Sequence, residues 1–197
     1  MAGKKQFDVD AAVDAAMIQF WRDGYADTSV DDLSRATGLN RSSIYSSLGA
    51  KDTLFLRCLE RYAARYGERY DAALSCAASD PVAAVRAFFD VTLDRIADPG
   101  LPDGCLIAQS AMAIPVLSPS IAAHARQALG SQRLRLRTAL KAGRLTDEDA
   151  ETFAVHAAAV NQSLAVMSRA GASPAQLRAV VGVTLDALAQ ALRASRT

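Results

Sequence analysis

The sequence is poor in residues that interrupt helices, because its 197 residues include only 6 prolines and 11 glycines. Aromatic residues make up only 6% of the chain. Alanine is abundant, and it favours helix because its side chain loses no rotational freedom there. Apolar residues recur at intervals of three and four, and no segment shows the period of two that half-buried strands have. These features predict an all-α protein.

Cysteine pairs, excess charge and long apolar segments are also missing. The 3 cysteines form no C-x-x-C pair, which is typical of a reducing compartment rather than of a disulfide scaffold. The N-terminal segment has no apolar centre and therefore predicts no signal peptide. No window of about 18 uncharged apolar residues predicts a membrane span. We expect a cytoplasmic protein without membrane contact, and the net charge of +1 does not by itself indicate a nucleic-acid partner.

Capping residues divide the chain into successive helical segments. Asp8 and Asn40 are suited to begin helices, and Ser29 with Asp32 resembles a capping box. Pro81 occupies a first helical position, where a missing N–H costs nothing. The predicted helices are 9–23, 29–37, 41–47, 51–75, 81–96, 105–113, 119–142, 147–170 and 174–194.

The segment 28–51 predicts a helix-turn-helix, with two short helices joined by a glycine-containing turn. Ile44 and Leu48 are one turn apart on the second helix, so both can pack inward. At about 100° per residue, Ser42 and Ser46 then point away from the core. A helix this short is stable only if one face packs against its neighbours, and the other face remains free for a partner.

The free face of this second helix suits the major groove of DNA. Its side chains are small or carry hydroxyls, and an arginine stands at its start; they are Arg41, Ser42, Ser43, Tyr45 and Ser46. Arginine reads guanine through two hydrogen bonds, worth ~1–3 kcal/mol of discrimination. Hydroxyl groups bond to phosphates or base edges, and free N–H groups at a helix start attract phosphate.

Over residues 9–56 the sequence resembles the DNA-binding domain of TetR/AcrR-type transcriptional regulators. The matching residues are Gly24-Tyr25, Thr28-Ser29-Val30, Leu33, Gly38-Leu39, Ile44-Tyr45 and Lys51-Asp52-x-Leu54. The remainder is similar in architecture only. The resemblance implies a helix-turn-helix domain at 1–50 and a helical domain for ligand binding and dimerisation at 51–197. It further implies a homodimer that binds a palindromic double-stranded operator and releases it when a small molecule binds, with no cofactor.

The resemblance also assigns DNA contacts residue by residue. They fall on Thr28, Arg41, Ser42, Ser43, Tyr45, Ser46 and Lys51. Thr28, Tyr45 and Lys51 would hold phosphate, and the others would face the groove. The chain departs from the family pattern at Leu48, where phenylalanine is usual, and at Ser46 or Ser47, where histidine is frequent. One phosphate contact therefore lacks its usual residue.

The charge of this domain is balanced rather than basic. Residues 1–57 contain 7 Lys/Arg and 8 Asp/Glu, against the usual footprint of a DNA-binding domain. We expect Lys4, Lys5, Arg35, Arg41 and Lys51 to gather on the DNA side and to give a modest salt dependence.

The two C-terminal helices carry the most regular apolar seams. These are Phe153, Ala157, Val160, Leu164 and Met167 in the first, and Leu177, Val181, Leu185, Leu188 and Leu192 in the second. A period near 3.5 is typical of helices packed along their length, and an antiparallel pair can form half of a four-helix bundle. The other half can come from this chain or from a second copy. The terminal position favours a homodimer through 147–170 and 174–194.

A ligand pocket is expected between helices of the second domain. The candidate lining residues are Phe88, Phe89, Leu93, Cys105, Gln109, Met112, Asn161, Gln162 and Met167. Core packing is an alternative explanation for each of them. Few charges fall on these helix faces, which favours a small and largely apolar effector.

Several other features have a structural or a functional interpretation. Cys105 begins a helix, where the pKa of a thiol falls, so a redox- or electrophile-sensing regulator is an alternative to a ligand-binding one. Trp21 is assigned to packing, and Asp31 and Asp32 to the dipole of the helix that they begin. The stripe Arg126, Arg133, Arg137, Lys141 and Arg144 is assigned to a solvated face that pairs with the acidic segment after it.

The sequence contains no catalytic or cofactor signature. It has no G-x-S-x-G, no phosphate-binding loop and no dinucleotide-binding glycines, and His124 and His156 have no metal-ligand spacing. We therefore expect no enzyme, no metal and no cofactor. The remaining alternative is a helical protein-interaction module that does not bind DNA. Activation instead of repression is also compatible with the sequence.

Overall fold

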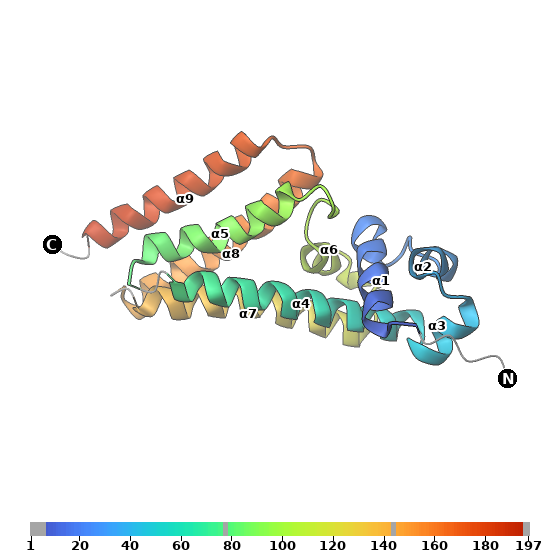
Figure 1. The fold of residues 1–197 in the computed structure, drawn as a ribbon. Coiled ribbons are helices and arrows are strands. Elements are labelled where there is room, and N and C mark those ends of the chain that lie inside the picture. Colours follow the sequence, from blue (N-terminus) through green and yellow to red (C-terminus); the bar gives the residue numbers. More distant parts are fainter. Residues whose placement is uncertain (1–6, 77–78, 143–144, 195–197) are drawn as a thin grey trace.

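The computed structural model describes residues 7–76, 79–142 and 145–194, and within these ranges every regular element is helical (Figure 1). The helices are α1 Val9–Asp23, α2 Val30–Thr37, α3 Arg41–Ser47, α4 Lys51–Cys76, α5 Pro81–Ala97, α6 Leu106–Met112, the 3-10 turn η1 Ile114–Val116, α7 Pro119–Ala142, α8 Asp147–Arg169 and α9 Pro174–Ala194. The predicted all-α fold is confirmed. The predicted division at residue 50 falls where α4 begins, and as a domain boundary it stays a prediction.

Helices α1 to α3 gather at one end of the molecule, and α4 runs from this end along the larger helical part (Figure 1). Helix α4 packs against α1, α5 and α7. Helix α8 packs against α7, and α9 covers α5 and α8. Since α4 contacts both parts of the molecule, it is the main structural connection between them.

Local capping explains where several helices begin. The side chain of Asp8 accepts hydrogen bonds from the backbone N–H groups of Asp10 and Ala11, and Thr146 accepts one from Asp149. These bonds satisfy amides that have no partner inside a helix. The boundaries predicted from capping residues therefore agree closely with the observed ones.

A row of buried aromatic side chains joins α1 to α4. Tyr62, Tyr66 and Tyr70 are four residues apart along α4, so they share one helix face, and each is only 3% exposed. The Trp21 ring of α1 is fully buried, with its centroid 5.1 Å from that of Tyr62 and 6.3 Å from that of Tyr66. Edge-on pairs of this kind contribute about 0.5–1.5 kcal/mol each beyond burial. The predicted packing role of Trp21 is confirmed.

The interior of the larger part contains a chain of buried hydrogen bonds. The hydroxyl oxygens of Tyr70 and Thr92 are 2.7 Å apart, and Thr92 donates to Oδ1 of Asn161 at 2.6 Å. Asn161 Nδ2 points to Oε1 of Gln132 at 3.5 Å, which also accepts from Gln162 Nε2 at 2.7 Å. Buried polar groups are costly unless they are bonded in this way. Asn161 therefore serves the packing between α5, α7 and α8.

The basic stripe of α7 pairs with the start of α8, as predicted. Arg133 and Arg137 both contact the carboxylate of Glu151, and Lys141 Nζ lies 2.9 Å from Asp147 Oδ1. Arg144 falls outside the described residues. The stripe therefore holds two consecutive helices together, and these exposed pairs contribute little free energy each.

Candidate nucleic-acid interface

The helix-turn-helix is built from two short helices with capped starts. The Ser29 hydroxyl accepts from the Asp32 N–H at 3.2 Å, and the Asp32 carboxylate accepts from the Ser29 N–H at 2.8 Å. Gly38 ends α2 with φ of 69°, a left-handed conformation that glycine adopts without strain. Asn40 Oδ1 then accepts from the Ser43 N–H at 2.8 Å and begins α3. The predicted caps are thus confirmed in geometry.

The two faces of α3 are oriented as the sequence predicted. Ile44 and Leu48 are 2% and 1% exposed and pack into the core. Ser42 and Ser46 are exposed on the opposite face, and the Tyr45 side chain beside them is 54% exposed. The free surface of α3 is therefore rich in hydroxyls, and its one charged side chain is Arg41 at the helix start.

The guanidinium at the start of α3 is held by a carboxylate of α2. Arg41 Nε donates to Asp31 Oδ1 at 2.7 Å, and Nη2 donates to the other oxygen of the same carboxylate. The hydrogen bond from Arg41 holds the pKa of Asp31 below its usual value. Both side chains are more than half exposed. The fork that would face a guanine is thus occupied by an internal acceptor of similar geometry.

Thr28 does not have the role that the sequence suggested. Its side chain is fully buried, and its hydroxyl donates to the Gly24 carbonyl oxygen at 2.6 Å. The predicted phosphate contact of this side chain is therefore wrong, because the hydroxyl is enclosed and already has a partner. The bond instead fixes the turn between α1 and α2.

Lys51 lies over an aromatic ring at the start of α4. Its Nζ is 4.4 Å from the centroid of the Tyr25 ring and 3.5 Å from the Ala26 carbonyl oxygen, and partial burial lowers its pKa. The Tyr25 hydroxyl donates to the carboxylate of Asp52, and burial together with this neighbour raises the pKa of Tyr25 to about 12. The ammonium of Lys51 is thereby held beside the turn that precedes α2.

Each described cation of the expected DNA side has a partner within the protein. Arg35 pairs with Asp32, Arg41 with Asp31, and Lys51 with the Tyr25 ring. Lys4 and Lys5 fall outside the described residues. Two of these three cations are therefore neutralised by carboxylates of α2, and the third lies over a neutral ring.

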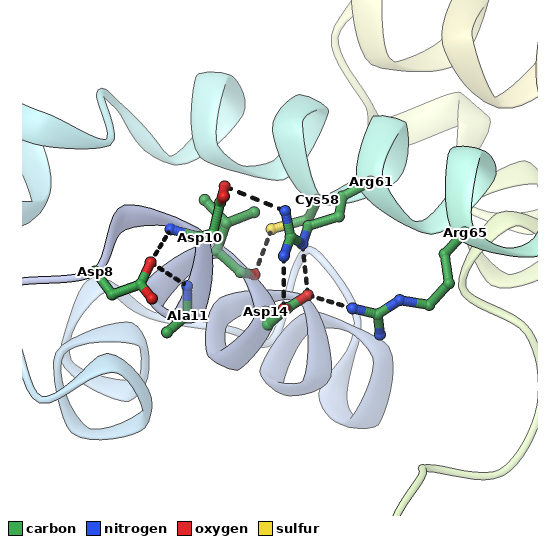
Figure 2. Close-up of polar contacts among 8 residues, drawn as sticks. Asp8, Asp10, Ala11, Asp14, Cys58, Arg61 and Arg65 are labelled. Carbon is green, nitrogen blue, oxygen red and sulfur yellow. Dashed lines mark hydrogen bonds and ion pairs between the residues drawn. The ribbon is translucent and has the colours of Figure 1, made fainter.

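Figure 2 shows how α1 is fixed to α4 by charged side chains. The carboxylate of Asp14 accepts from Arg61 at 2.6 and 2.8 Å and from Arg65 at 2.7 Å. Asp10 accepts from Arg61 at 3.2 Å. The hydrogen bonds from Arg61 hold the pKa of Asp14 below its usual value. A movement of α4 would therefore carry α1 with it.

A cleft of about 270 Å³ lies where α6 meets the C-terminal end of α8. It is lined by Gly104, Cys105, Ala108, Gln109, Met112, Ala165, Val166 and Arg169. Three residues that the sequence proposed for a ligand site, Cys105, Gln109 and Met112, come together here. Small residues on both walls leave the space open.

Other proposed pocket residues are packed in the protein interior. Phe88 and Phe89 are fully buried, and Phe88 stacks on Tyr70 with centroids 4.5 Å apart. Leu93 and Met167 are half-buried and pack against the same core. Asn161 belongs to the hydrogen-bonded chain described above, and none of these five residues lines the cleft between α6 and α8, so as ligand contacts they stay predictions. The spacing of these residues at intervals of three and four is that of a helix face packed against the core.

Arg169 is a residue of the cleft that the sequence analysis did not identify. Its Nη1 donates to Gln109 Oε1 at 2.8 Å, and its Nη2 donates to the Arg22 carbonyl oxygen at 2.5 Å. The sequence signal was only a basic residue in the last turn of a helix, which usually complements that helix's own dipole. Here the guanidinium also reaches the end of α1.

A buried arginine stands behind the same cleft. Arg95 of α5 is 3% exposed, and its guanidinium donates to the Gly104 carbonyl oxygen. Its Cζ lies 5.6 Å from the Trp21 ring centroid and 5.5 Å from that of Tyr66. Its Nε has no hydrogen-bond partner. Within the described ranges, its contacts are a carbonyl group and aromatic faces rather than a carboxylate.

A second cleft, of about 300 Å³, separates α4 from α7 and has a more polar lining. Glu60, Tyr66, His124, Gln132 and Arg135 are among its residues. None of its lining residues belongs to α1, α2 or α3, although Tyr62 and Tyr66 pack against Trp21 of α1. In the described ranges no group of three His, Cys, Asp or Glu is placed to hold a metal ion, and no helix there is long and apolar enough to cross a membrane.

Three capped helices that present a hydroxyl-rich recognition helix, joined by α4 to a larger helical part, define a helix-turn-helix DNA-binding protein. Comparison with known sequences supports this class. The profile of bacterial regulatory proteins of the tetR family matches residues 12–58, and that of the tetracyclin repressor-like C-terminal domain matches residues 81–184. The chain belongs to the TetR family, and it is a DNA-binding transcriptional regulator rather than an enzyme.

Two curated proteins and two solved structures illustrate the similarity. The HTH-type transcriptional repressor ComR of Escherichia coli is 29% identical, with 92% of this chain and 89% of ComR covered. The uncharacterized HTH-type regulator YezE of Bacillus subtilis is also 29% identical, over 95% and 100%. The regulator CifR, solved as a cysteine mutant with a 26-bp operator DNA, has a TM-score of 0.78 and 27% identity over 93% and 97%. A TetR-family regulator from Agrobacterium tumefaciens has a TM-score of 0.78 and 26% identity over 90% and 95%.

Proposed function

We propose that the protein is a homodimeric repressor that binds a palindromic operator and releases it when a small, largely apolar molecule binds the C-terminal part. The observation that carries the DNA-binding mode is the exposed hydroxyl-rich face of α3, with Arg41 at its start. We assign base contacts to Arg41, Ser42, Ser43 and Ser46, and phosphate contacts to Tyr45 and Lys51. Acting on chromosomal DNA would place the protein in the cytoplasm.

The apolar seams of α8 and α9 pack inside the chain, with Ala157, Leu164, Leu177, Val181, Leu185 and Leu188 buried, so a dimer would use the opposite, exposed surface of the two helices. On α8 the outward side chains between Glu151 and Arg169 are uncharged, and Val155 is 49% exposed. On α9, Val183 is 72% exposed. Two copies of such a surface can form a symmetric four-helix bundle. A dimer would hold two α3 helices about 34–36 Å apart, which is the spacing of successive major grooves on one face of DNA.

The cleft between α6 and α8 is the effector site that we propose, because it joins three predicted lining residues to a contact with α1. An effector can release the operator only if it binds the non-binding conformation more tightly. Displacement of α6 or of the end of α8 would disturb the contact with α1 and change the spacing of the two recognition helices.

Chemical modification of Cys105 is a second candidate for the inducing signal. Its thiol is 7% exposed, lines the cleft, and accepts a hydrogen bond from the Tyr62 hydroxyl at 3.3 Å. N-ethylmaleimide treatment that releases DNA from the native protein, but not from a Cys105→Ser variant, would favour this candidate over reversible binding.

The proposed function is tested by selecting duplexes from a random library with the purified full-length protein. We expect an inverted repeat that is bound by two copies and protected in footprinting. A protein-interaction module would select no sequence even at low ionic strength, and that result would refute the proposal. Reporter expression in the presence and absence of the protein then distinguishes repression from activation.

A further inference from the structure

Arg169 joins the cleft between α6 and α8 directly to the DNA-binding part. One side of its guanidinium bonds to Gln109 of α6, and the other bonds to the Arg22 carbonyl oxygen at the end of α1. Gln109 is itself close to the turn after α1, since a Cβ on Gly24 would lie 2.9 Å from its Nε2. A single side chain of α8 therefore holds a backbone group that is 147 residues away in sequence.

The size and lining of the cleft limit what it can hold. Its volume of about 270 Å³ is slightly below the usual range for drug-sized ligands, ~300–1,000 Å³. Ala108, Met112, Ala165 and Val166 provide an apolar wall, and the charged group in the lining is Arg169. The ligand that fits is small, with an apolar body and one group complementary to a guanidinium.

The charge around the cleft favours an anion. Arg169 donates to two neutral oxygens, an amide and a backbone carbonyl, and within the described residues it pairs with no carboxylate. Arg95 lies behind Gly104, buried and with its Nε unpartnered. A buried cation without a counter-charge is costly and is relieved by a nearby anion. Two cations without carboxylate partners thus flank one small apolar space.

We propose that this cleft binds a small organic carboxylate with an apolar body. The bound carboxylate replaces the Arg22 carbonyl oxygen as a hydrogen-bond acceptor of the Arg169 guanidinium. This inference rests on the proposed function and gives the chemical class of the effector. A carboxylate adds a second charge to the hydrogen bond and can accept two parallel bonds from the guanidinium, whereas a neutral oxygen offers only the charge of the donor. Binding therefore competes with the contact that joins α8 to α1, and it loosens the position of the DNA-binding part.

The first test measures binding without DNA. The purified full-length protein is titrated calorimetrically with butanoate and hexanoate, and with butanamide and hexanamide as uncharged counterparts. We expect the carboxylates to bind at least tenfold more tightly than their amides. Arg169→Met should abolish this preference, whereas Arg126→Met, which removes an exposed arginine of α7, should leave it unchanged.

The second test uses the duplex selected by the protein itself. Hexanoate should weaken operator binding by the native protein and by Arg126→Met at least tenfold, and it should have no effect on Arg169→Met. If Arg169→Met does not fold, as judged by circular dichroism, Arg169→Lys is used, and it should keep a preference for carboxylate because the charge remains.

The outcomes separate the two proposals. A protein that selects no duplex contradicts the proposed function, whatever the calorimetry shows. A protein that selects a duplex but binds amides as tightly as carboxylates, or binds neither class, contradicts this inference alone. Unchanged carboxylate binding in Arg169→Met, or loss of the preference in Arg169→Lys, contradicts it as well.

Discussion

Arg41, the first residue of α3, donates two hydrogen bonds to the carboxylate of Asp31 on α2. The guanidinium fork that suits a guanine edge is thus already paired in the free protein. DNA must therefore compete with an internal carboxylate before Arg41 can read a base. The pair is exposed, so it contributes little to stability, and its main effect should be on recognition.

Removal of the Arg41 side chain should weaken binding to the selected duplex. We expect Arg41→Ala to lose about 1–3 kcal/mol of binding free energy to the preferred sequence, and discrimination at one base pair of each half-site should relax. The melting temperature should change little. Fluorescence anisotropy with the selected duplex and single-base variants measures both effects.

Arg35 provides a matched control for this prediction. It is also an exposed arginine of the helix-turn-helix, and it pairs with Asp32 within α2. Arg35→Ala removes the same charge but leaves the recognition face intact. Equal losses of affinity and equal specificity in the two variants would show that Arg41 acts only through its charge.

Removal of the Asp31 carboxylate should strengthen non-specific binding to DNA, whereas removal of the Arg41 side chain should weaken specific binding. Asp31→Asn leaves Arg41 unpaired and removes a negative charge that would lie near phosphate. We expect tighter binding to random duplex, a salt slope steeper by about one unit, and a smaller ratio between selected and random sequences. Titrations at several salt concentrations measure these quantities. A variant whose salt slope and specificity equal those of the native protein would rule out this role for Asp31.

The inward and outward faces of α3 were predictable, but the Asp31–Arg41 pair was not. Periodicity places Ile44 and Leu48 inward because a short helix has only one apolar stripe to bury. Asp31 stands at a helix start, where the helix dipole is a sufficient explanation for a carboxylate. Which way its side chain turns depends on how α2 and α3 cross, and that angle is set by packing between helices.

The ligand site was predictable only in part, for a related reason. Apolar residues at helical spacing mark a buried face, and a packed core has the same pattern as a pocket wall. The sequence therefore predicts Phe88 and Phe89 equally well as pocket residues or as core residues, and in the structure both are fully buried. Arg169 could not be found at all, because its partner is the backbone of Arg22, and a backbone carbonyl leaves no signature in a sequence.

The dimer surface yields a test with a closely matched control. Val183 on α9 and Val116 in η1 are 72% and 71% exposed, but only Val183 lies on the proposed dimer surface. Val183→Glu would place a carboxylate from each copy in the proposed interface, which should cost about 2–4 kcal/mol of association free energy. Sedimentation velocity should then show a shift toward monomer, with weaker operator binding. Val116→Glu should remain dimeric, and dissociation in both variants, or in neither, would contradict the proposed surface.

The ion-pair cluster between α1 and α4 should make stability depend on pH in a defined direction. Hydrogen bonds from Arg61 hold the pKa of Asp14 below its usual value in the folded protein. A depressed pKa stabilises the fold above the ordinary aspartate pKa of about 3.9, and this contribution disappears as pH falls through the folded-state value. We therefore expect Asp14→Asn to be less stable than the native protein at pH 7, and the difference to shrink steadily below about pH 4. Because 34% of the Asp14 side chain remains exposed, solvent screening should limit the loss to about 1 kcal/mol.

Urea unfolding across this pH range measures the difference in stability, with a substitution of the exposed Asp90, Asp90→Asn, as a control. A constant difference between Asp14→Asn and the native protein from pH 7 to pH 3 would mean that the side chain acts through shape rather than through its charge.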